Sequence, residues 1–263
     1  SDEIGPLASA AAASLAAAAT IVPLALFVGG DPTGQDLVLS ACSGVGFGIG
    51  IAAYLLGVRV SSSAVIGPTV AALATLIPFL YAAVVEDLPP ILAWLGAITV
   101  VTGLLFVTMG GDVASNVRGG LPIGVMSGLG YGIGTAFLVD VTDDAGVWPV
   151  ASQRCMAFIT IILWAMLRKR PLLPPMRFAP QSTAAGLFGG LSTALLLAGF
   201  TFNAAATSVT ASLFPATSVA AGRLFFGDAV SRAQVIGLVI VIIGTITIVT
   251  VSYTHLTLPT RLM

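Results

Sequence analysis

The sequence predicts an all-α protein, a polytopic bundle of helices that crosses a membrane many times. Of its 263 residues, 57% are hydrophobic and only 8% are charged, and the mean hydropathy is +1.06. Because this number of charges is too small to cover a water-soluble surface, the outside of the protein is expected to face lipid. The apolar runs are long and do not alternate, which favours helices of about 20 residues over barrel strands of about 10.

Four apolar spans are expected in the first part of the chain, at residues 6–29, 37–57, 63–85 and 90–110. Each is long enough for a helix that rises 1.5 Å per residue to cross the hydrocarbon layer. Short loops join them, such as Asp31 to Asp36 and Glu86 to Pro90, where acidic residues and prolines interrupt the apolar run.

Five further spans are expected at residues 119–140, 147–167, 183–203, 207–227 and 233–250. With about nine spans in the chain, the loops leave no room for a soluble domain. Function is therefore expected to reside among the helices.

One pattern of residues occurs twice in this chain. Each copy has a proline in an apolar span, then an acid, then two glycines: Pro68, Glu86, Gly96 and Gly103 in the first, and Pro215, Asp228, Gly237 and Gly244 in the second. The glycines are seven residues apart in both copies, two helical turns on nearly one face. A duplicated helix pair is typical of transporters built from two repeats with the substrate path between them. Both prolines remove a backbone hydrogen bond and are expected to bend their helices.

This duplicated pattern resembles that of the EamA-type transporters of the drug/metabolite transporter superfamily. The resemblance extends to about Thr250 and implies two five-helix repeats of opposite topology, here residues 1–110 and 111–250. The first copy departs from the second, because proline and acid are 18 residues apart in one and 13 in the other. Only four spans precede residue 111, so we expect about nine helices of ten, with the first helix of the first repeat missing.

The last residues are expected to be foreign to the protein. The run from Val251 to Thr260 is similar, residue for residue, to the translation of an adapter used to prepare DNA for sequencing. We therefore interpret residues 251–263 as a non-native tail and exclude them from the fold. His255, the single histidine of the chain, lies in that tail.

Arg154 is the strongest candidate for a site residue, because a charge within the membrane is costly and tends to be functional. It lies well inside a span that ends before Arg168, fourteen residues or about 21 Å of helix away. On the cavity hypothesis it lines the path together with Gln153 and favours anionic groups such as a carboxylate. The alternatives are that Arg154 reaches the nearer membrane surface, or that it forms a structural ion pair with one of the acids Asp140, Asp143 and Asp144.

Four other polar residues are lesser candidates for contacts with a solute. Tyr54, Tyr131, Asn203 and Thr210 carry hydrogen-bonding or stacking groups within apolar spans, although such residues more often serve as interfacial anchors or interhelical hydrogen bonds. Their hypothesised role is to line a mostly apolar binding pocket.

The sequence contains no catalytic constellation. Metal-ligand spacings and phosphate loops are missing, so we expect no enzyme activity, no metal and no cofactor. Cys42 and Cys155 lie in apolar spans and are expected to be buried and unpaired. A net charge of -1 offers no basic surface, which excludes nucleic acid as a partner.

The function implied by the resemblance is secondary transport, in which small organic metabolites such as amino acids or drugs are moved by alternating access. The expected partners are a small organic solute and the lipid bilayer, and the expected location is a bacterial inner (plasma) membrane; a homodimer is left open. Two other functions remain as alternatives. A non-transporting scaffold would have packing glycines without a polar cavity, and a membrane-embedded lipid-modifying enzyme would have clustered acids, histidines or serines.

Two signals disagree on the orientation in the membrane. The arginines and lysine gather at alternate junctions, around Arg118 and at 168–170, whereas acids gather at the others. The positive-inside rule predicts that the basic junctions are cytoplasmic. Family members usually keep both termini in the cytoplasm, which implies the reverse.

Overall fold

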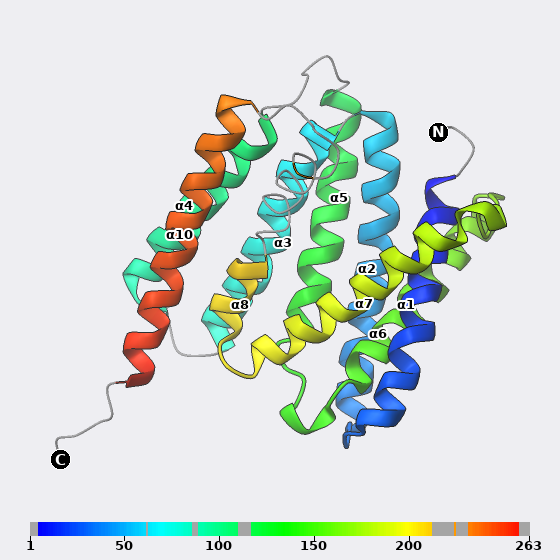
Figure 1. Ribbon diagram of the computed structural model, residues 1–263, viewed down its shortest axis with the longest axis horizontal. Helices are drawn as coiled ribbons and strands as arrows, with labels where there is room; N and C mark the ends of the chain where they lie inside the picture. The colour runs from blue at the N-terminus through cyan, green and yellow to red at the C-terminus, as the bar shows by residue number, and fades with distance from the viewer. Residues whose placement is uncertain are drawn as a thin grey trace.

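A computed structural model describes residues 5–61, 63–85, 89–109, 117–211, 224 and 231–257 of the chain. These residues are built from α-helices that stand side by side (Figure 1), which confirms the predicted helical membrane bundle. The bounds are α1 Pro6–Val28, α2 Gly34–Val60, α3 Ser63–Val85, α4 Ile91–Met109, α5 Val117–Ala136, α6 Trp148–Leu167, α7 Ala179–Phe200, α8 Ala204–Ala211 and α10 Arg232–Thr257, with short 3-10 helices η1 Asp143–Ala145 and η2 Met176–Phe178.

Four of the described segments are long and apolar enough to cross a membrane by themselves: Pro6–Val28, Gly34–Val60, Trp148–Leu167 and Met176–Phe200. Three shorter apolar stretches accompany them, at Thr69–Val85, Ile91–Phe106 and Arg232–Thr247. Side chains that are largely exposed, such as Leu163 at 55%, cover the outside of the bundle as a lipid environment requires.

Helix starts are set by local chemistry that shifts several predicted boundaries. The span expected at 37–57 begins at Gly34, because the Thr33 hydroxyl accepts the Asp36 amide proton while the Asp36 carboxylate accepts the Thr33 amide proton. Ser231 and Gln234 form the same reciprocal cap at the start of α10. Such caps satisfy amide groups that have no partner within the helix.

Other boundaries differ at the helix ends. The span expected at 119–140 is helical only to Ala136, and the span expected at 183–203 starts at Ala179, where Pro180 occupies the first turn and needs no amide partner. Of the span expected at 207–227, the structure describes residues 207–211, which lie in α8, and residue 224; α8 itself starts earlier, at Ala204. Helix α10 extends through the expected tail as far as Thr257.

Glycines of α2 hold it against two neighbouring helices. A β-carbon on Gly46 would lie 2.6 Å from the Gly130 carbonyl oxygen of α5, and one on Gly44 would lie 2.4 Å from the Gln153 carbonyl oxygen of α6. No side chain fits at such a separation, so the backbones touch directly. Because lipid gives no hydrophobic drive between helices, close packing of this kind holds the bundle together.

Helix α5 also packs on α3 through a second set of glycines. Gly124, Gly128 and Gly132 lie against Thr69, Leu73 and Ile77, a row of three on each helix with a spacing of four residues. These contacts hold α5 closely against α3. Together with the contacts to α2, they place α5, the first helix of the second expected repeat, against two helices of the first.

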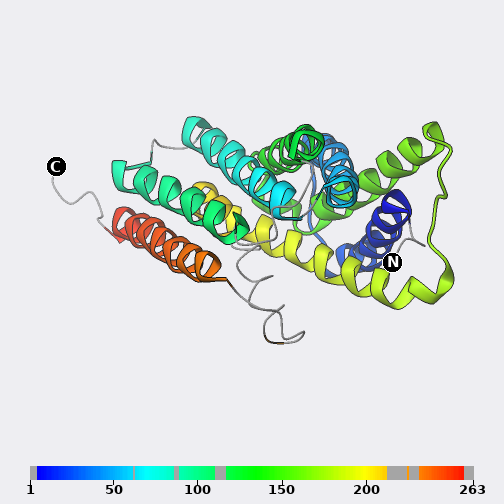
Figure 2. The same ribbon diagram turned by 90° about the horizontal axis from the view of Figure 1, so that it is seen from above.

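Helices α4 and α10 form a pair at one edge of the molecule, which Figure 2 shows from above. A β-carbon on Gly103 would lie 2.7 Å from the Val241 amide nitrogen, and one on Gly244 would lie 2.8 Å from the Val100 amide nitrogen. The glycines of the duplicated pattern thus pack the two copies onto each other.

The remaining helices form the other side of the bundle, with α1 against α6 and α7, and α2 against α6. A buried apolar cluster joins α1, α3, α4, α6, α7, α8 and α10, with Phe79, Leu104, Leu138 and Val150 fully enclosed. Seven helices from all parts of the chain therefore share one core.

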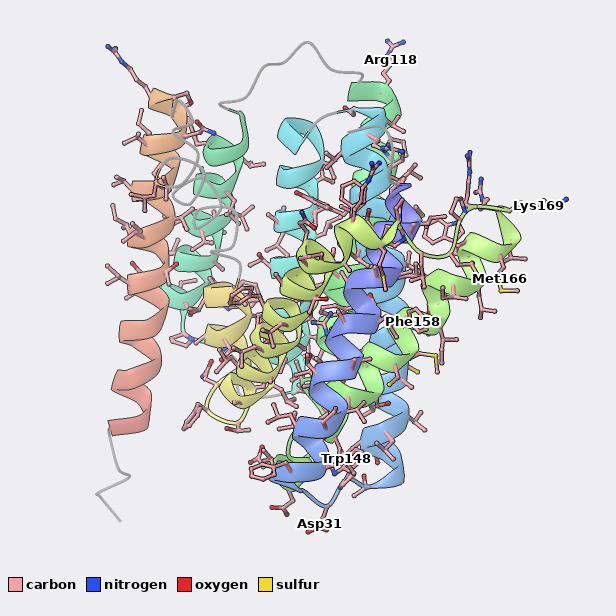
Figure 3. The ribbon with its side chains drawn as sticks, turned by 45° about the vertical axis from the view of Figure 1, so that its right-hand side comes forward. Asp31, Arg118, Trp148, Phe158, Met166 and Lys169 are labelled. Carbon is pink, nitrogen blue, oxygen red and sulfur yellow. The ribbon has the colours of Figure 1, made fainter. Side chains whose placement is uncertain are left out.

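The ends of the bundle differ in charge. Figure 3 shows Arg118 and Lys169 at one end, here named the basic end, and Asp31 at the other, named the acidic end. Helix α6 runs from the acidic end, near Trp148, to the basic end, near Met166 and Lys169. The basic and acidic junctions that alternate along the sequence therefore lie at opposite ends of the bundle.

The cysteines and the residues of the duplicated pattern differ in how the structure bears on their predicted roles. Cys42 and Cys155 are exposed free thiols, so the expectation that they are buried was wrong. Pro68 lies in α3, but its side chain is outside the described residues, and so are Pro215, Glu86 and Asp228. The predicted bends at the two prolines remain predictions.

Candidate functional site

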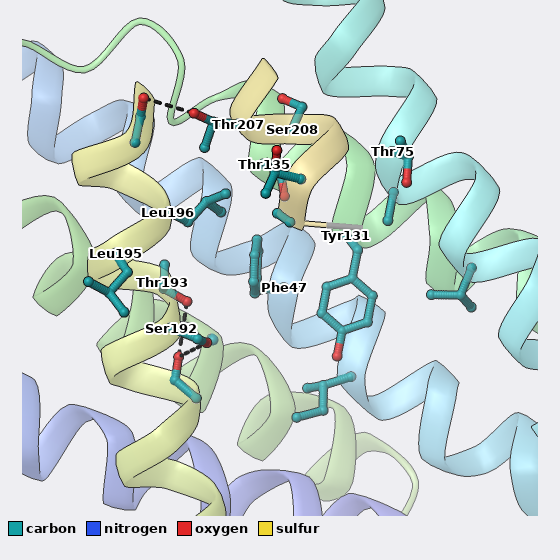
Figure 4. A pocket seen from close by; sticks show the side chains of 18 of the residues that line it. Phe47, Thr75, Tyr131, Thr135, Ser192, Thr193, Leu195, Leu196, Thr207 and Ser208 are labelled. Atoms are coloured by element: carbon teal, nitrogen blue, oxygen red, sulfur yellow. Dashed lines mark hydrogen bonds between the residues drawn. The ribbon is translucent and has the colours of Figure 1, made fainter. Parts of the chain in front are cut away.

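A cavity of about 980 Å³ lies between the helices, lined by residues of α1, α2, α3, α5, α6, α7 and α8. Its wall is mostly apolar, with hydroxyl groups, tyrosines and one guanidinium among aliphatic side chains. Figure 4 shows Phe47 and Tyr131 on one side and Ser192, Thr193 and Leu196 on the other. A volume in the range of ligand pockets and a few convergent polar groups are typical of small-molecule sites.

Five of the six predicted site residues lie on the wall of this cavity. They come from four different parts of the chain: Tyr54 from α2, Tyr131 from α5, Arg154 from α6, and Asn203 and Thr210 from the start and end of α8. The sixth, Gln153, does not line the cavity. The fold therefore brings together residues as far apart as 54 and 210 in the sequence.

Arg154 is 8% exposed and is bound to α7. Its Nη2 donates to the Gly189 carbonyl oxygen over 2.7 Å and also to the Thr193 hydroxyl. The guanidinium carbon lies 5.4 Å from the centre of the Phe47 ring of α2, a cation–π contact. Among the described residues, none of Asp140, Asp143 and Asp144 makes an ion pair with Arg154, whose bonds go to α7 instead.

The Nε group of Arg154 has no hydrogen-bond partner among the described residues, although it is buried. The hydroxyls of Tyr54 and Tyr131 likewise have no partner in that part of the chain. Phe47 meets Tyr131 edge to face, with ring centres 5.2 Å apart. Arg154, Phe47 and Tyr131 therefore form a continuous row along the cavity from α6 through α2 to α5.

Gln153 points away from the cavity, into the contact between α6 and α2. Its side chain is fully buried, and Nε2 donates to the Ser43 hydroxyl over 2.8 Å. Its Oε1 has no partner among the described residues. Neighbours on a helix point about 100° apart, which here places Arg154 on the cavity side of α6 and Gln153 on the side that faces α2. We interpret Gln153 as a packing residue that fixes α6 on α2.

Asn203 and Thr210 have local structural bonds besides their place at the cavity. The Asn203 Oδ1 accepts the Ala206 amide proton over 2.6 Å and caps α8. The Thr210 hydroxyl donates to the Ala206 carbonyl oxygen over 2.8 Å. A capping Asn keeps its amide NH2 group free, whereas a Thr bonded in this way has only its oxygen lone pairs left to offer.

Sequence reasoning missed much of the wall. Phe47, Ser14 and six hydroxyl residues of the later helices also line the cavity: Thr75, Thr135, Ser192, Thr193, Thr207 and Ser208. Serine and threonine in apolar helices usually bond to a carbonyl four residues back, as Ser208 does to Ala204. Those that face a cavity therefore look the same in sequence as those that face lipid.

A second polar cluster closes the acidic end. Asp36 is 1% exposed, and its carboxylate accepts protons from the amide and hydroxyl of Thr33 at 2.8 and 2.7 Å. The carboxylate also accepts hydrogen bonds from the amide and the hydroxyl of Thr142, in the α5–α6 connection, at 2.9 Å each. Nearby, the Asp31 amide donates to the Asp144 carbonyl oxygen over 2.8 Å, and the Tyr81 hydroxyl to Asp140. The signal for this cluster was the Thr-x-x-Asp spacing of 33 and 36.

Within the described residues no group of three or more His, Cys, Asp or Glu side chains is placed to hold a metal ion. The polar groups of the cavity are instead suited to hydrogen bonding and to a single ionic contact. Such a wall can bind a small organic molecule and release it again.

The chain matches one family model, that of the EamA-like transporter family, over residues 118–250. No curated protein matches it. Eighteen chains of solved structures do, and one of them, a crystal structure of a protein, superposes with a TM-score of 0.72 at 16% identity. That alignment covers 96% of this chain and 90% of the other, and at such identity it shows the fold alone. The family match spans half of the chain, and the chain therefore belongs to the EamA-like transporter family.

Proposed function

We propose that this protein is a secondary transporter that carries small organic metabolites, such as amino acids or drugs, across the membrane by alternating access. The observation that carries the proposal is the cavity of about 980 Å³, which is lined by α1 to α3 from the first part of the chain and by α5 to α8 from the second. A binding site enclosed by both halves can be exposed to either side when the halves tilt against each other.

Two repeats, residues 1–110 and 111–250, are part of this proposal. The contacts of α4 with α10 support it, since Gly103 against Val241 mirrors Gly244 against Val100. Equivalent residues of the two copies are offset by the same 141 residues, 241 − 100 for the valines and 244 − 103 for the glycines. The contact of α2 with α6 is mirrored by that of α7 with α1. A two-fold relation of this kind is what an inverted repeat produces.

The glycine contacts suit such a motion. Where Gly46 and Gly50 of α2 meet Gly130 of α5, there are no side chains to interlock. Smooth helix faces can shift by small distances without repacking a core, whereas interdigitated side chains resist such a shift.

The proposal also includes export of the solute, with proton coupling or none, and a location in a bacterial inner membrane. A homodimer is compatible with it.

The test is solute flux in proteoliposomes that contain the purified protein, with protein-free liposomes as the blank. A panel of labelled amino acids, organic acids, nucleosides, sugars and cationic dyes covers the solute classes. We expect at least one solute to move down its gradient faster than the blank. Well-folded protein that moves none of them would overturn the proposal and favour the scaffold.

A matched pair of variants ties the flux to the cavity. Ala74→Trp fills the cavity from α3, while Leu163→Trp adds the same bulk to an exposed position on α6. We expect A74W to abolish flux and L163W to retain it. Equal flux through both variants would contradict a path through this cavity.

A further inference from the structure

The buried charge of Arg154 has no opposite charge beside it in the described part of the chain. Its contacts there are a carbonyl oxygen, a hydroxyl and an aromatic ring. Asp36, the buried acid among the described residues, is held instead by Thr33 and Thr142 at the acidic end. A buried cation without a counter-charge is costly, and the cost is much larger in a low-dielectric interior than in water.

The same side chain keeps unused hydrogen-bonding capacity. Nη2 is committed to Gly189 and Thr193, but Nε has no acceptor in the described residues. A buried donor without a partner is destabilising, so an acceptor brought to Nε would stabilise this side chain. The cavity that Arg154 lines is where such an acceptor can enter.

We propose that the transported solute is an organic monocarboxylate, and that its carboxylate supplies the missing counter-charge of Arg154. This inference rests on the proposed function. A guanidinium matches a carboxylate in shape, since its planar N–H groups can meet both oxygens. The hydroxyls of Tyr54 and Tyr131, which have no partner among the described residues, offer further donors on the same wall.

The rest of the cavity wall favours a solute whose part other than the carboxylate is apolar. Phe47 and Tyr131 present ring surfaces next to the guanidinium, and Ile51, Val70 and Leu196 are aliphatic. A fully hydrated inorganic anion would leave these surfaces wet, whereas an apolar solute removes them from water. The cavity therefore favours a carboxylate with an aromatic or aliphatic tail over chloride or phosphate.

A purely structural role for Arg154 predicts a different outcome and can be separated from this one. In a purely structural role, Arg154 would act only by linking α6 to α7 through its hydrogen bonds to Gly189 and Thr193. Thr193→Val removes one of these bonds and leaves the charge in place. It is therefore the matched control for Arg154→Gln, which removes the charge and keeps much of the side-chain bulk.

The experiment measures binding to the purified protein in lipid nanodiscs by ligand-dependent thermal stabilisation at constant chloride and ionic strength. The probes are two pairs that differ only in charge: benzoate with benzamide, and hexanoate with hexanamide. We expect each carboxylate to bind roughly tenfold or more tightly than its amide, the effect of a charge-assisted hydrogen bond. The preference should weaken in Arg154→Lys and vanish in R154Q. T193V, which also changes the cavity wall, should bind both members of each pair less tightly but still favour the carboxylate over the amide.

Each other outcome overturns the inference. No difference between carboxylate and amide in the parent protein contradicts it, as does a preference that survives in R154Q. If phosphate or chloride stabilises the protein to the same extent as benzoate, and this effect is lost in R154Q, the ligand of Arg154 is a simple anion and not an organic carboxylate. Flux of neutral solutes without any carboxylate preference would sink this inference and leave transport standing, whereas absence of all flux would remove the proposed function itself.

Discussion

Gly103 of α4 lies against the backbone of Gly237 of α10, and a β-carbon at Gly103 would lie 2.8 Å from the Gly237 carbonyl oxygen. The reciprocal contact is made by Gly244 with the Gly96 carbonyl oxygen, where the separation would be 2.9 Å. The sequence showed these four glycines as a spacing of seven residues that occurs twice. The structure shows that the two glycines of α4 pack against the two glycines of α10.

Gly103→Ala should therefore destabilise the protein by about 1–3 kcal/mol, the usual cost of overpacking a close contact. The added methyl group meets backbone atoms of α10, which cannot rotate away. Thermal unfolding in detergent, followed by tryptophan fluorescence, measures the change. Gly189→Ala is the control, because a β-carbon there meets nothing within 4 Å, and its stability should be unchanged or slightly higher. Equal losses in the two variants would contradict direct packing of α4 on α10.

Asp36→Ala should destabilise the acidic end. The carboxylate accepts four hydrogen bonds, two of them from backbone amides of Thr33 and Thr142. Removing it takes this acceptor from the amides and hydroxyls of Thr33 and Thr142, whose bonds are partly buried, at a cost of about 0.5–1.5 kcal/mol for each bond lost. Thermal unfolding and proteolysis within the 137–147 connection measure the loss. Asp31→Asn is the matched control, since Asp31 is exposed and uses its backbone amide for the contact with Asp144. A stable D36A protein would show that this cluster contributes little.

Gln153→Leu should change stability little and leave the solute preference of the protein intact. The variant loses the bond to Ser43 but also removes a buried Oε1 that has no partner among the described residues. A double-mutant cycle with Ser43→Ala should give a coupling of about 0.5–1.5 kcal/mol, the net value of one hydrogen bond. A changed solute profile in Q153L would instead return Gln153 to the binding site.

The basic end is expected to face the cytoplasm, by the positive-inside rule. Single cysteines at Asp31 and Lys169, introduced after removal of the exposed Cys42 and Cys155, should report this in whole cells. A membrane-impermeant maleimide should label the cysteine at 31 and not the one at 169. The opposite pattern would show that the orientation common in the family prevails over the charge bias.

The sequence was sufficient for the helices and insufficient for their faces. Long apolar runs located most helix bounds to within a few residues, and caps such as Thr33 with Asp36 account for part of the difference. In water, a polar stripe shows which face of a helix is outside. Here core and lipid are both apolar, so Cys42 and Leu163 on the outside are indistinguishable in sequence from Ile161, which is fully buried.

The same reason explains which site residues were found. Arg154 stood out because a charge in the membrane is rare and costly. Tyr54, Tyr131 and Asn203 were polar enough to be noticed. Ser192, Thr193 and Ser208 were missed because their hydroxyls bond to carbonyl oxygens of their own helices. Nothing in the sequence shows that the bundle turns them toward the cavity.

The position of α5 has a consequence for biosynthesis. This helix, the first described after residue 110, packs on α2 and α3, while α4 packs most extensively on α10, the last helix that the structure describes. Roughly 120 residues separate α4 from α10, which takes about 6–24 s at 5–20 residues per second. During that time α4 stays without α10, the helix that covers Gly96 and Gly103. Expressed as two separate polypeptides, the halves should be degraded alone and rescued when produced together.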